Sequence, residues 1–387
     1  MSDSTSLHRA CKCAGEGRRV RAIAGSRAHR YTPHMPSHVA HLLFADDVLG
    51  ATTPHPGLRA LAEPPHRRYL VLGAQGPDIF YHNQRRRPTS IAYGSLMHRR
   101  GYGTCVAHMC EWAAGQGLGI ASWAGALIVG FTTHAVLDRH THPFINAHSG
   151  WPEPGDRTTE TYRSMHPFLE RLIDVELLRM RRGIHPNDLG FYRRVTCGES
   201  APAQWIDLMN HALSGTYRKA SLDRNLDERL RNAYLDAMGY YRFTDRVDGA
   251  YLEEALARED AGQIGPRWLS IIHPPEVPPE LDVLNQSGRS WPHPCPDGPT
   301  TTKSFLDCYE QALEGARAVI VRVAEAWSGS TVDRSRVEEA VTNWNLSDGR
   351  ATERPCRKHY ARPLPLRELQ TRIRESIRSG SAGRLHH

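Results

Sequence analysis

The sequence predicts an all-α protein that forms a single large helical domain with disordered basic termini. Apolar residues recur every three or four positions through most of the 387 residues, and strand-type alternation is nearly absent. Hydrophobic residues make up 40% of the chain, which is enough to bury a sizeable core. These observations together favour helix packed on helix.

The first elements can be assigned from capping and turn residues. Ser37 is a candidate cap for a helix over 38–49, and a shorter helix is expected near 57–63. The apolar run YLVLGAQGPDIFYH turns sharply at Gly76 and Pro77. Later helices are predicted over 89–117, 119–141, 158–182, 203–220, 225–246, 247–258, 303–328, 332–345 and 364–378.

This pattern divides the chain into four parts. The region 263–302 contains nine prolines and is typical of an extended connection. The four parts are a disordered basic arm (1–34), a helical domain (35–260), a Pro-rich connection with C-terminal helices packed on that domain (261–346) and a basic tail (347–387).

The formal net charge of +7 comes from the two ends of the chain. Residues 1–34 contain seven basic and two acidic residues, and 351–387 contain nine basic and three acidic residues. The remaining region, 35–350, therefore has a small acidic excess. Such a body gives no electrostatic support for binding a polyanion, so nucleic acid is not expected as a partner.

The cysteines are scattered and form no CxxC pair. We expect buried free thiols in a reducing compartment, rather than a disulfide framework or a cysteine zinc site. The eight are Cys11, Cys13, Cys105, Cys110, Cys197, Cys295, Cys308 and Cys356.

The N-terminal stretch has no apolar core of the kind found in secretory signals, so a cytoplasmic location is expected. The stretch 112–133 has no formal charge and is long enough to span a bilayer. It contains polar residues and several glycines, however, and runs directly into His134 and Asp138. We therefore predict a buried core helix and no transmembrane segment.

Candidate metal ligands gather in the stretch FTTHAVLDRHTHPFI. His134 and Asp138 are four residues apart, so a helix places them on one face. His142 follows at the next step, where Pro143 is expected to end the helix. His140 lies off that face and is the weaker candidate.

A second pair, His166 and Glu170, repeats the spacing of four residues. Two helices that each offer an imidazole and a carboxylate are the design of metal sites in helical bundles. Imidazole and carboxylate ligands without thiolate are typical of catalytic zinc. The alternatives are that the histidines are ordinary core residues, and that Glu170, Arg171 and Asp174 form a solvated face.

Five pieces of the sequence, in this order, resemble the zinc-dependent phospholipase C family, which is related in fold to the S1/P1 nucleases. They are SHVAHLLFADDVL, GAQGPDIFYH, GSLMHRRGYG, HAVLDRHTHPFI and HPFLERLID. The resemblance covers about 35–180 and extends more loosely to 282–313. It implies a helical domain of the phospholipase C/P1 nuclease type that holds two to three zinc ions.

Carried over residue by residue, the resemblance implies Asp78, His98, His134 and Asp138 as ligands of one zinc, His142, His166 and Glu170 as ligands of a second, and His41 with Asp138 as ligands of a third. Asp78 is also the expected catalytic base, because it can ligate a metal and orient a bridging water. The alternative is that Asp78 caps the helix that follows the turn.

This sequence departs from the family in two ways that bear on the site. In the secreted members a mature N-terminal tryptophan completes the third zinc site, whereas here His38 could substitute or the third site stays empty. In addition, Pro167 directly follows His166, so His166 is expected in the first turn of its helix.

The expected function is that of a zinc-dependent phosphodiester hydrolase, of the phospholipase C type, which cleaves a phospholipid headgroup with a metal-activated water and so degrades lipid. One alternative is an S1/P1-like nuclease or another phosphodiesterase. The other is a non-catalytic zinc-binding helical protein. The expected partner is a phospholipid or small phosphodiester, and peripheral contact with a membrane is left open.

Overall fold

The structure is built almost entirely from helices. Helices account for 64% and strands for 2% of the described residues, which confirms the predicted all-α class. The computed structural model describes residues 37–52, 55–328 and 330–380, all of which belong to the unit Pro33–His387. The predicted basic arm, 1–34, lies outside the described residues.

One long helix, α6 (Trp123–Ser149), runs through the core and organises the rest. The hydroxyl of Ser122 caps it by accepting a hydrogen bond from the N–H of Gly125 at 3.2 Å. Most residues of α6 are buried, which is typical of a helix with protein on all sides. The helices that pack on it are α1 (His38–Thr52), α3 (Arg67–Ala74), α5 (Tyr102–Gly115), α7 (Met165–Arg182) and α13 (Phe305–Ala326).

The contact between α3 and α6 is unusually close because two glycines line it. A Cβ on Gly73 would lie 2.1 Å from the carbonyl oxygen of Leu127, and a Cβ on Gly130 would lie 2.1 Å from that of Leu70. Neither position has room for a side chain. The two backbones therefore touch, and this contact fixes the turn that follows α3 against α6.

The uncharged stretch 112–133 does not form one helix, since α5 ends at Gly115 and α6 starts at Trp123. Within the described residues, none of the helices combines the length and the apolar character that crossing a bilayer requires.

The remaining elements are short or lie at the periphery. Two pairs of two-residue strands are antiparallel, β1 with β2 and β3 with β4. The bounds are α2 (Pro56–Arg59), η1 (Ala60–Ala62), η2 (Gly76–Phe80), α4 (Ile91–Arg99), η3 (Arg157–Ser164), η4 (Pro186–Asp188), α8 (Phe191–Val195), α9 (Ala203–Thr216), α10 (Arg218–Ser221), α11 (Leu226–Thr244), α12 (Gly249–Asp260), η5 (Pro266–Ile271), β1 (Trp291–Pro292), β2 (Thr300–Thr301), β3 (Trp327–Ser328), β4 (Thr331–Val332), α14 (Arg334–Val341) and α15 (Leu366–Arg378).

The prediction that Pro143 ends its helix is wrong, because α6 continues six residues further, to Ser149. Proline has no N–H, so the carbonyl of Arg139 loses its partner four residues on. The backbone at Gly349 packs directly on this turn, where a Cβ would lie 2.7 Å from the Arg139 oxygen. Burial among neighbouring segments holds the helix through the proline.

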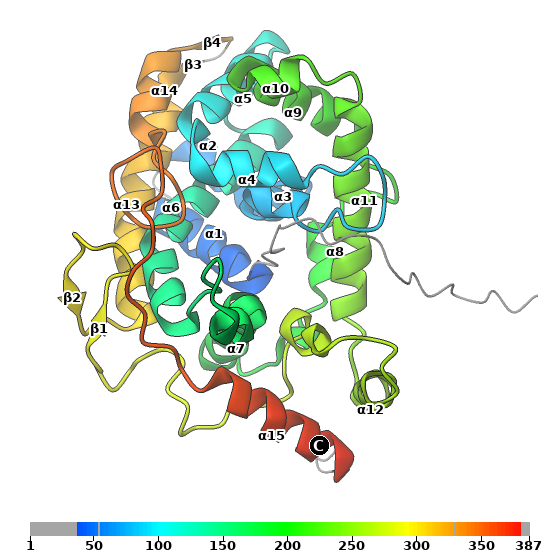
Figure 1. Cartoon of the computed structure of the whole chain (residues 1–387). Coiled ribbons are helices and arrows are strands. Elements are labelled where there is room, and N and C mark those ends of the chain that lie inside the picture. Colours follow the sequence, from blue (N-terminus) through cyan, green and yellow to red (C-terminus); the bar gives the residue numbers. More distant parts are fainter. Residues whose placement is uncertain (1–36, 53–54, 329, 381–387) are drawn as a thin grey trace, which may run out of the picture. The chain divides into compact units, whose positions relative to one another are not determined.

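The C-terminal region also differs from the expectation of a disordered tail. Residues 347–380 are part of the fold, and α15 packs on α7 and α12 (Figure 1). This helix buries one apolar face, formed by Leu366, Leu369, Ile373 and Ile377.

A disulfide joins Cys295 to Cys356, which corrects the expectation of free thiols for these two residues. They are 61 positions apart, so no local spacing marked them as partners. The free thiols are Cys105, Cys110, Cys197 and Cys308. Cys11 and Cys13 lie outside the described residues.

Candidate metal centre

Three residues of α6 form the middle of a polar cluster inside the core. His134, Asp138 and His142 follow each other at intervals of one helical turn and project from the same face of α6. Asp138 is only 3% exposed. Its Oδ2 lies 3.1 Å from Nε2 of His134, and its Oδ1 lies 3.7 Å from Nε2 of His142. The carboxylate therefore stands between the two imidazoles.

The other five predicted ligands reach this face from four different elements. His41 comes from α1, Asp78 from η2, His98 from the last turn of α4, and His166 and Glu170 from α7. We call the eight residues together the metal-site cluster. Its members are His41, Asp78, His98, His134, Asp138, His142, His166 and Glu170, and all are buried or nearly so.

The first group of ligand atoms lies around Asp78 and Asp138. His98 Nε2 is 3.0 Å from Asp78 Oδ1 and 3.6 Å from Asp138 Oδ2. His134 Nε2 is 3.8 Å from Asp78 Oδ2. These are the four residues expected to share the first zinc. Ligand atoms of His98, His134 and Asp138 lie within 4.8 Å of one another, and Asp78 belongs to an adjoining group with His41 and His134.

The second group lies one turn further along α6. His166 Nε2 is 3.3 Å from Glu170 Oε1, and His142 Nε2 is 3.9 Å from the same oxygen. As Pro167 suggested, His166 is the second residue of α7 and so lies in its first turn. The three ligand atoms lie within 4.8 Å of one another, so one ion could contact all of them.

His41 lies near the Asp138 oxygen that does not face His98. Its Nε2 is 3.4 Å from Asp138 Oδ1 and 3.9 Å from Asp78 Oδ2, and its ring stacks on that of His134 at 4.1 Å. A small cavity beside it, about 10 Å³ in size, is bordered by His41, Asp138 and Glu170. This is about the space that one water-sized group needs.

The suggestion that His38 could complete a third zinc site is not supported by its position. His38 Nδ1 accepts a hydrogen bond from the guanidinium of Arg171 at 2.8 Å, and its ring packs edge-on against Phe191. His38 therefore belongs to a neighbouring network rather than to the metal-site cluster.

Backbone carbonyls orient three imidazoles of the cluster. The Nδ1 atoms of His98, His134 and His142 lie 2.8, 3.1 and 2.6 Å from the carbonyl oxygens of Gly94, Ala74 and Leu346. A carbonyl only accepts, so each Nδ1 must carry the proton. Each Nε2 then presents a lone pair to the interior of the cluster, which is the state that a metal ligand needs.

Several inward-facing atoms have no hydrogen-bond partner within the described part of the chain. They are His134 Nε2, Asp138 Oδ2 and Glu170 Oε2, all buried. The pair His134 and Asp138 is close but lacks the alignment of a hydrogen bond. Buried polar atoms are almost always satisfied, so these three atoms are available as ligands and the cluster could hold a metal ion.

Burial in the metal-site cluster disfavours the charged forms of several of its side chains. Burial raises the pKa of Glu170 to about 8 and raises that of Asp78 well above its usual value. Burial also raises the pKa of Asp138, but the imidazoles of His134 and His142 outweigh it and hold that pKa well below its usual value. Burial lowers the pKa of His41 to about 4, so its imidazole is neutral. A dication would stabilise the ionised carboxylates.

The donor set fits zinc. Five imidazole nitrogens and three carboxylates converge, without thiolate, from four helices and one 3-10 turn. Closely spaced dications need several carboxylates to offset their charge, and Asp138 can serve two groups at once.

The suggestion that Glu170, Arg171 and Asp174 form a solvated face is wrong. Arg171 and Asp174 are both 0% exposed. Asp174 accepts hydrogen bonds from the Ser37 hydroxyl and from the N–H of Ala40 at 2.8 Å, so it caps the start of α1. Asp174, rather than the predicted Ser37, is the main cap.

This network was not found from the sequence, yet it positions His41. Asp174 also lies 3.0 Å from Nε2 of His273 and 3.3 Å from the guanidinium of Arg171. It thereby joins α7 to the first turn of α1, one turn before His41. Apart from Arg171, the partners of Asp174 are 99 to 137 residues away along the chain, so no motif could have revealed them.

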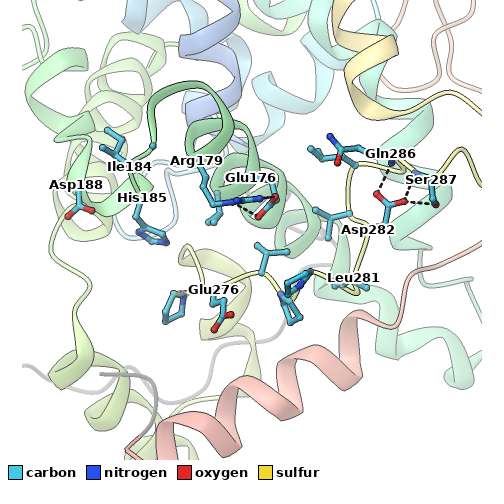
Figure 2. Close-up of a pocket in the computed structure, with 18 residues that line it drawn as sticks. Glu176, Arg179, Ile184, His185, Asp188, Glu276, Leu281, Asp282, Gln286 and Ser287 are labelled. Atoms are coloured by element: carbon cyan, nitrogen blue, oxygen red, sulfur yellow. Dashed lines mark hydrogen bonds and ion pairs between the residues drawn. The ribbon is translucent and has the colours of Figure 1, made fainter. Parts of the chain in front are cut away.

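A larger hollow lies elsewhere. A groove of about 890 Å³ runs between the C-terminal part of α7 and the proline-rich segment 275–287 (Figure 2). Asp282 closes one end by accepting hydrogen bonds from the backbone of Gln286 and Ser287. No member of the metal-site cluster lines this groove.

Comparisons with known protein families, with characterised proteins and with solved structures find no match for this chain.

Proposed function

We propose that the protein is a zinc-dependent phosphodiester hydrolase of the phospholipase C type, with the metal-site cluster as its active centre. The observation that carries this proposal is the position of Asp138, whose two oxygens face His134 and His142 in adjacent groups of ligands. A carboxylate shared between two ion sites is the arrangement that phosphoryl-transfer centres with several metals require.

The residues of the chain have separable roles in this proposal. Zinc ions held by the cluster would supply Lewis-acid stabilisation of a phosphate and lower the pKa of a water toward ~7. Asp78 is the proposed base, since its Oδ1 lies 3.0 Å from His98 and its buried carboxyl has a raised pKa. The proton would move to a carboxylate oxygen of Asp78. The proposed substrate is a phospholipid or a small phosphodiester.

The proposed cellular location follows from the disulfide. A Cys295–Cys356 bond is typical of proteins in oxidising compartments. It therefore argues against the cytoplasmic location that was expected from the N-terminal sequence.

The proposal is tested by metal content and hydrolysis on the same sample. We expect two to three zinc ions per chain and hydrolysis of bis(p-nitrophenyl) phosphate that is lost with a chelator and restored by zinc. The variant Asp78→Asn should stay folded and lose most of its turnover. A matched control is His140→Ala, since His140 lies on α6 but bonds to the carbonyl of Val136.

Other outcomes would point to the alternatives. One tightly held zinc without hydrolysis would indicate a non-catalytic zinc protein. Faster cleavage of single-stranded DNA than of phospholipid esters would indicate the nuclease alternative.

A further inference from the structure

A C-terminal segment borders the second ligand group. The carbonyl of Leu346 accepts the hydrogen bond of His142, and that of Ser347 accepts one from Asn146 at 2.9 Å. Further on, the N–H of Arg362 bonds to the carbonyl of Ala147. The segment 346–362 therefore follows α6 from the cluster outward.

This segment carries Lys358, whose ammonium lies near the second ligand group. Its ammonium donates to Asn146 Oδ1 at 2.5 Å and lies 5.4 Å from the ring centre of Trp151. Asn146 is one helical turn beyond His142 on the same face of α6. The charge of Lys358 also contributes to lowering the pKa of His166, so it is within electrostatic range of the second ligand group.

The ammonium of Lys358 lacks a direct counterion. Among the described residues no carboxylate lies within 4.0 Å of it, and its close partners are a neutral amide and an indole. Asp348 and Glu153 favour its charged form from further away, but burial outweighs them and lowers the pKa of Lys358 to about 8. A half-buried ammonium without a counterion is stabilised when an anion binds beside it.

The carboxylates nearby are already engaged with other donors. Asp348 accepts hydrogen bonds from the N–H of Cys356 at 2.6 Å and from Arg350. Glu153 accepts one from the indole N–H of Trp151. The charge of Lys358 therefore remains open to a ligand.

We propose that Lys358 is a specificity-determining residue that binds an anionic oxygen of the substrate beside His142 and His166, so that the centre prefers phosphoesters with a net negative charge. The surroundings disfavour a choline-type headgroup, because the ring of Trp151, the natural platform for a quaternary ammonium, faces the ammonium of Lys358. This inference rests on the proposed function and names its substrate class.

The test compares two esters with the same leaving group on the zinc-loaded full chain. Bis(p-nitrophenyl) phosphate carries one negative charge, and p-nitrophenyl phosphorylcholine carries none overall. In Lys358→Gln we expect kcat/KM for the anionic ester to fall about 10- to 100-fold, mainly through KM. For the zwitterionic ester, which has the same phosphate anion, we expect a clearly smaller fall, because the substitution also removes the repulsion between Lys358 and the choline ammonium. Lys358→Arg should retain the wild-type preference.

Arg357→Gln is the matched control, since it removes one positive charge at the neighbouring exposed position. Its ratio of the two kcat/KM values should equal that of the wild type. If thermal unfolding shows that Lys358→Gln is poorly folded, the measurement is repeated with Lys358→Met, which keeps the aliphatic stem.

Calorimetric titration with inorganic phosphate gives a readout apart from catalysis. We expect the phosphate affinity of the zinc-loaded protein to fall about tenfold in Lys358→Gln and to be unchanged in Arg357→Gln. If the wild type hydrolyses neither ester but shows this loss, the proposed function fails and the anion site stands. If the wild type is active and Lys358→Gln matches it in ester preference and phosphate affinity, the role of Lys358 is overturned.

Discussion

Gly76 packs against the imidazole of His134 so closely that a Cβ on Gly76 would lie 2.4 Å from the ring. The backbone of Gly76 also has a φ of +51°, which favours glycine. Gly76 is the first residue of the turn η2, which carries Asp78, so this contact sets two residues of the metal-site cluster against each other.

Gly76→Ala should therefore displace the ring of His134 and weaken zinc binding about tenfold or more, the effect expected when the support of a ligand is disturbed. The measurement is a competition titration with a chromogenic chelator. Gly115→Ala is the control, because a Cβ there meets nothing within 4 Å. Equal zinc affinity in both variants would contradict the role of Gly76.

Asp138→Ala should remove more than one equivalent of zinc. The carboxylate faces His134 in one ligand group and His142 in the next, so its loss weakens both. Metal analysis after gel filtration measures the stoichiometry, with His140→Ala as control. Loss of a single equivalent would show that Asp138 serves one ion alone.

Gly130→Ala should destabilise the fold by about 2–3 kcal/mol, the range expected for overpacking a tight contact. Its Cβ would meet the carbonyl oxygen of Leu70 at 2.1 Å, so α3 and α6 would have to separate. Urea unfolding measures the change. Gly239→Ala in α11 introduces a Cβ into open space and should not destabilise.

Asp236 holds the loop after η2 against α11, and its effect on stability should depend on pH. It accepts hydrogen bonds from the N–H groups of Arg85 and Arg86 and from the side chain of Asn83. Burial raises its pKa, but the bonds from Arg86 and Asn83 outweigh this and hold the pKa below its usual value. A depressed carboxyl pKa stabilises the folded state above the unfolded pKa of about 3.9, and this stabilisation is lost as the pH falls through the folded value.

Asp236→Asn should thus lower the free energy of unfolding by about 2 kcal/mol at pH 7. The difference from wild type should shrink as the pH is lowered below about 3.9. Urea unfolding of both proteins at several pH values gives this difference, and a gap that stays constant down to pH ~2.5 would contradict the electrostatic origin.

Reduction of the Cys295–Cys356 disulfide should lower the melting temperature, since closing a loop of this length is worth about 2–4 kcal/mol. The double variant Cys295→Ser/Cys356→Ser should melt at the reduced temperature and show no further response to reductant. If the wild type also fails to respond, the bond does not form in the protein as isolated.

The sequence was sufficient for features that depend on local spacing. The interval of four residues between His134, Asp138 and His142 placed them on one face, and Pro167 placed His166 in the first turn of its helix. The course of α6 through Pro143 was missed, because the backbone that packs on this turn is at Gly349, 206 residues later. Helix propensity depends on the residue type alone and does not report contacts between distant segments.

The other features that were missed also depend on contacts between distant parts of the chain. Asp174 looked like part of a charged face because Glu170 and Arg171 precede it, and only the fold shows that it caps α1. Lys358 lay in a stretch that composition alone marks as a basic tail. Its position next to Asn146 depends on the segment after Leu346 following α6, and on the disulfide that ties Cys356 to a distant loop.

A single helix, α6, supplies the central residues of both ligand groups, and this has a thermodynamic consequence. A first ion bound at Asp138 would order the carboxylate that the two ligand groups share. A second ion would then bind with a smaller loss of conformational entropy, because the shared side chain is already ordered. Loading of the centre should therefore be positively cooperative, with a saturation curve steeper than that of independent sites.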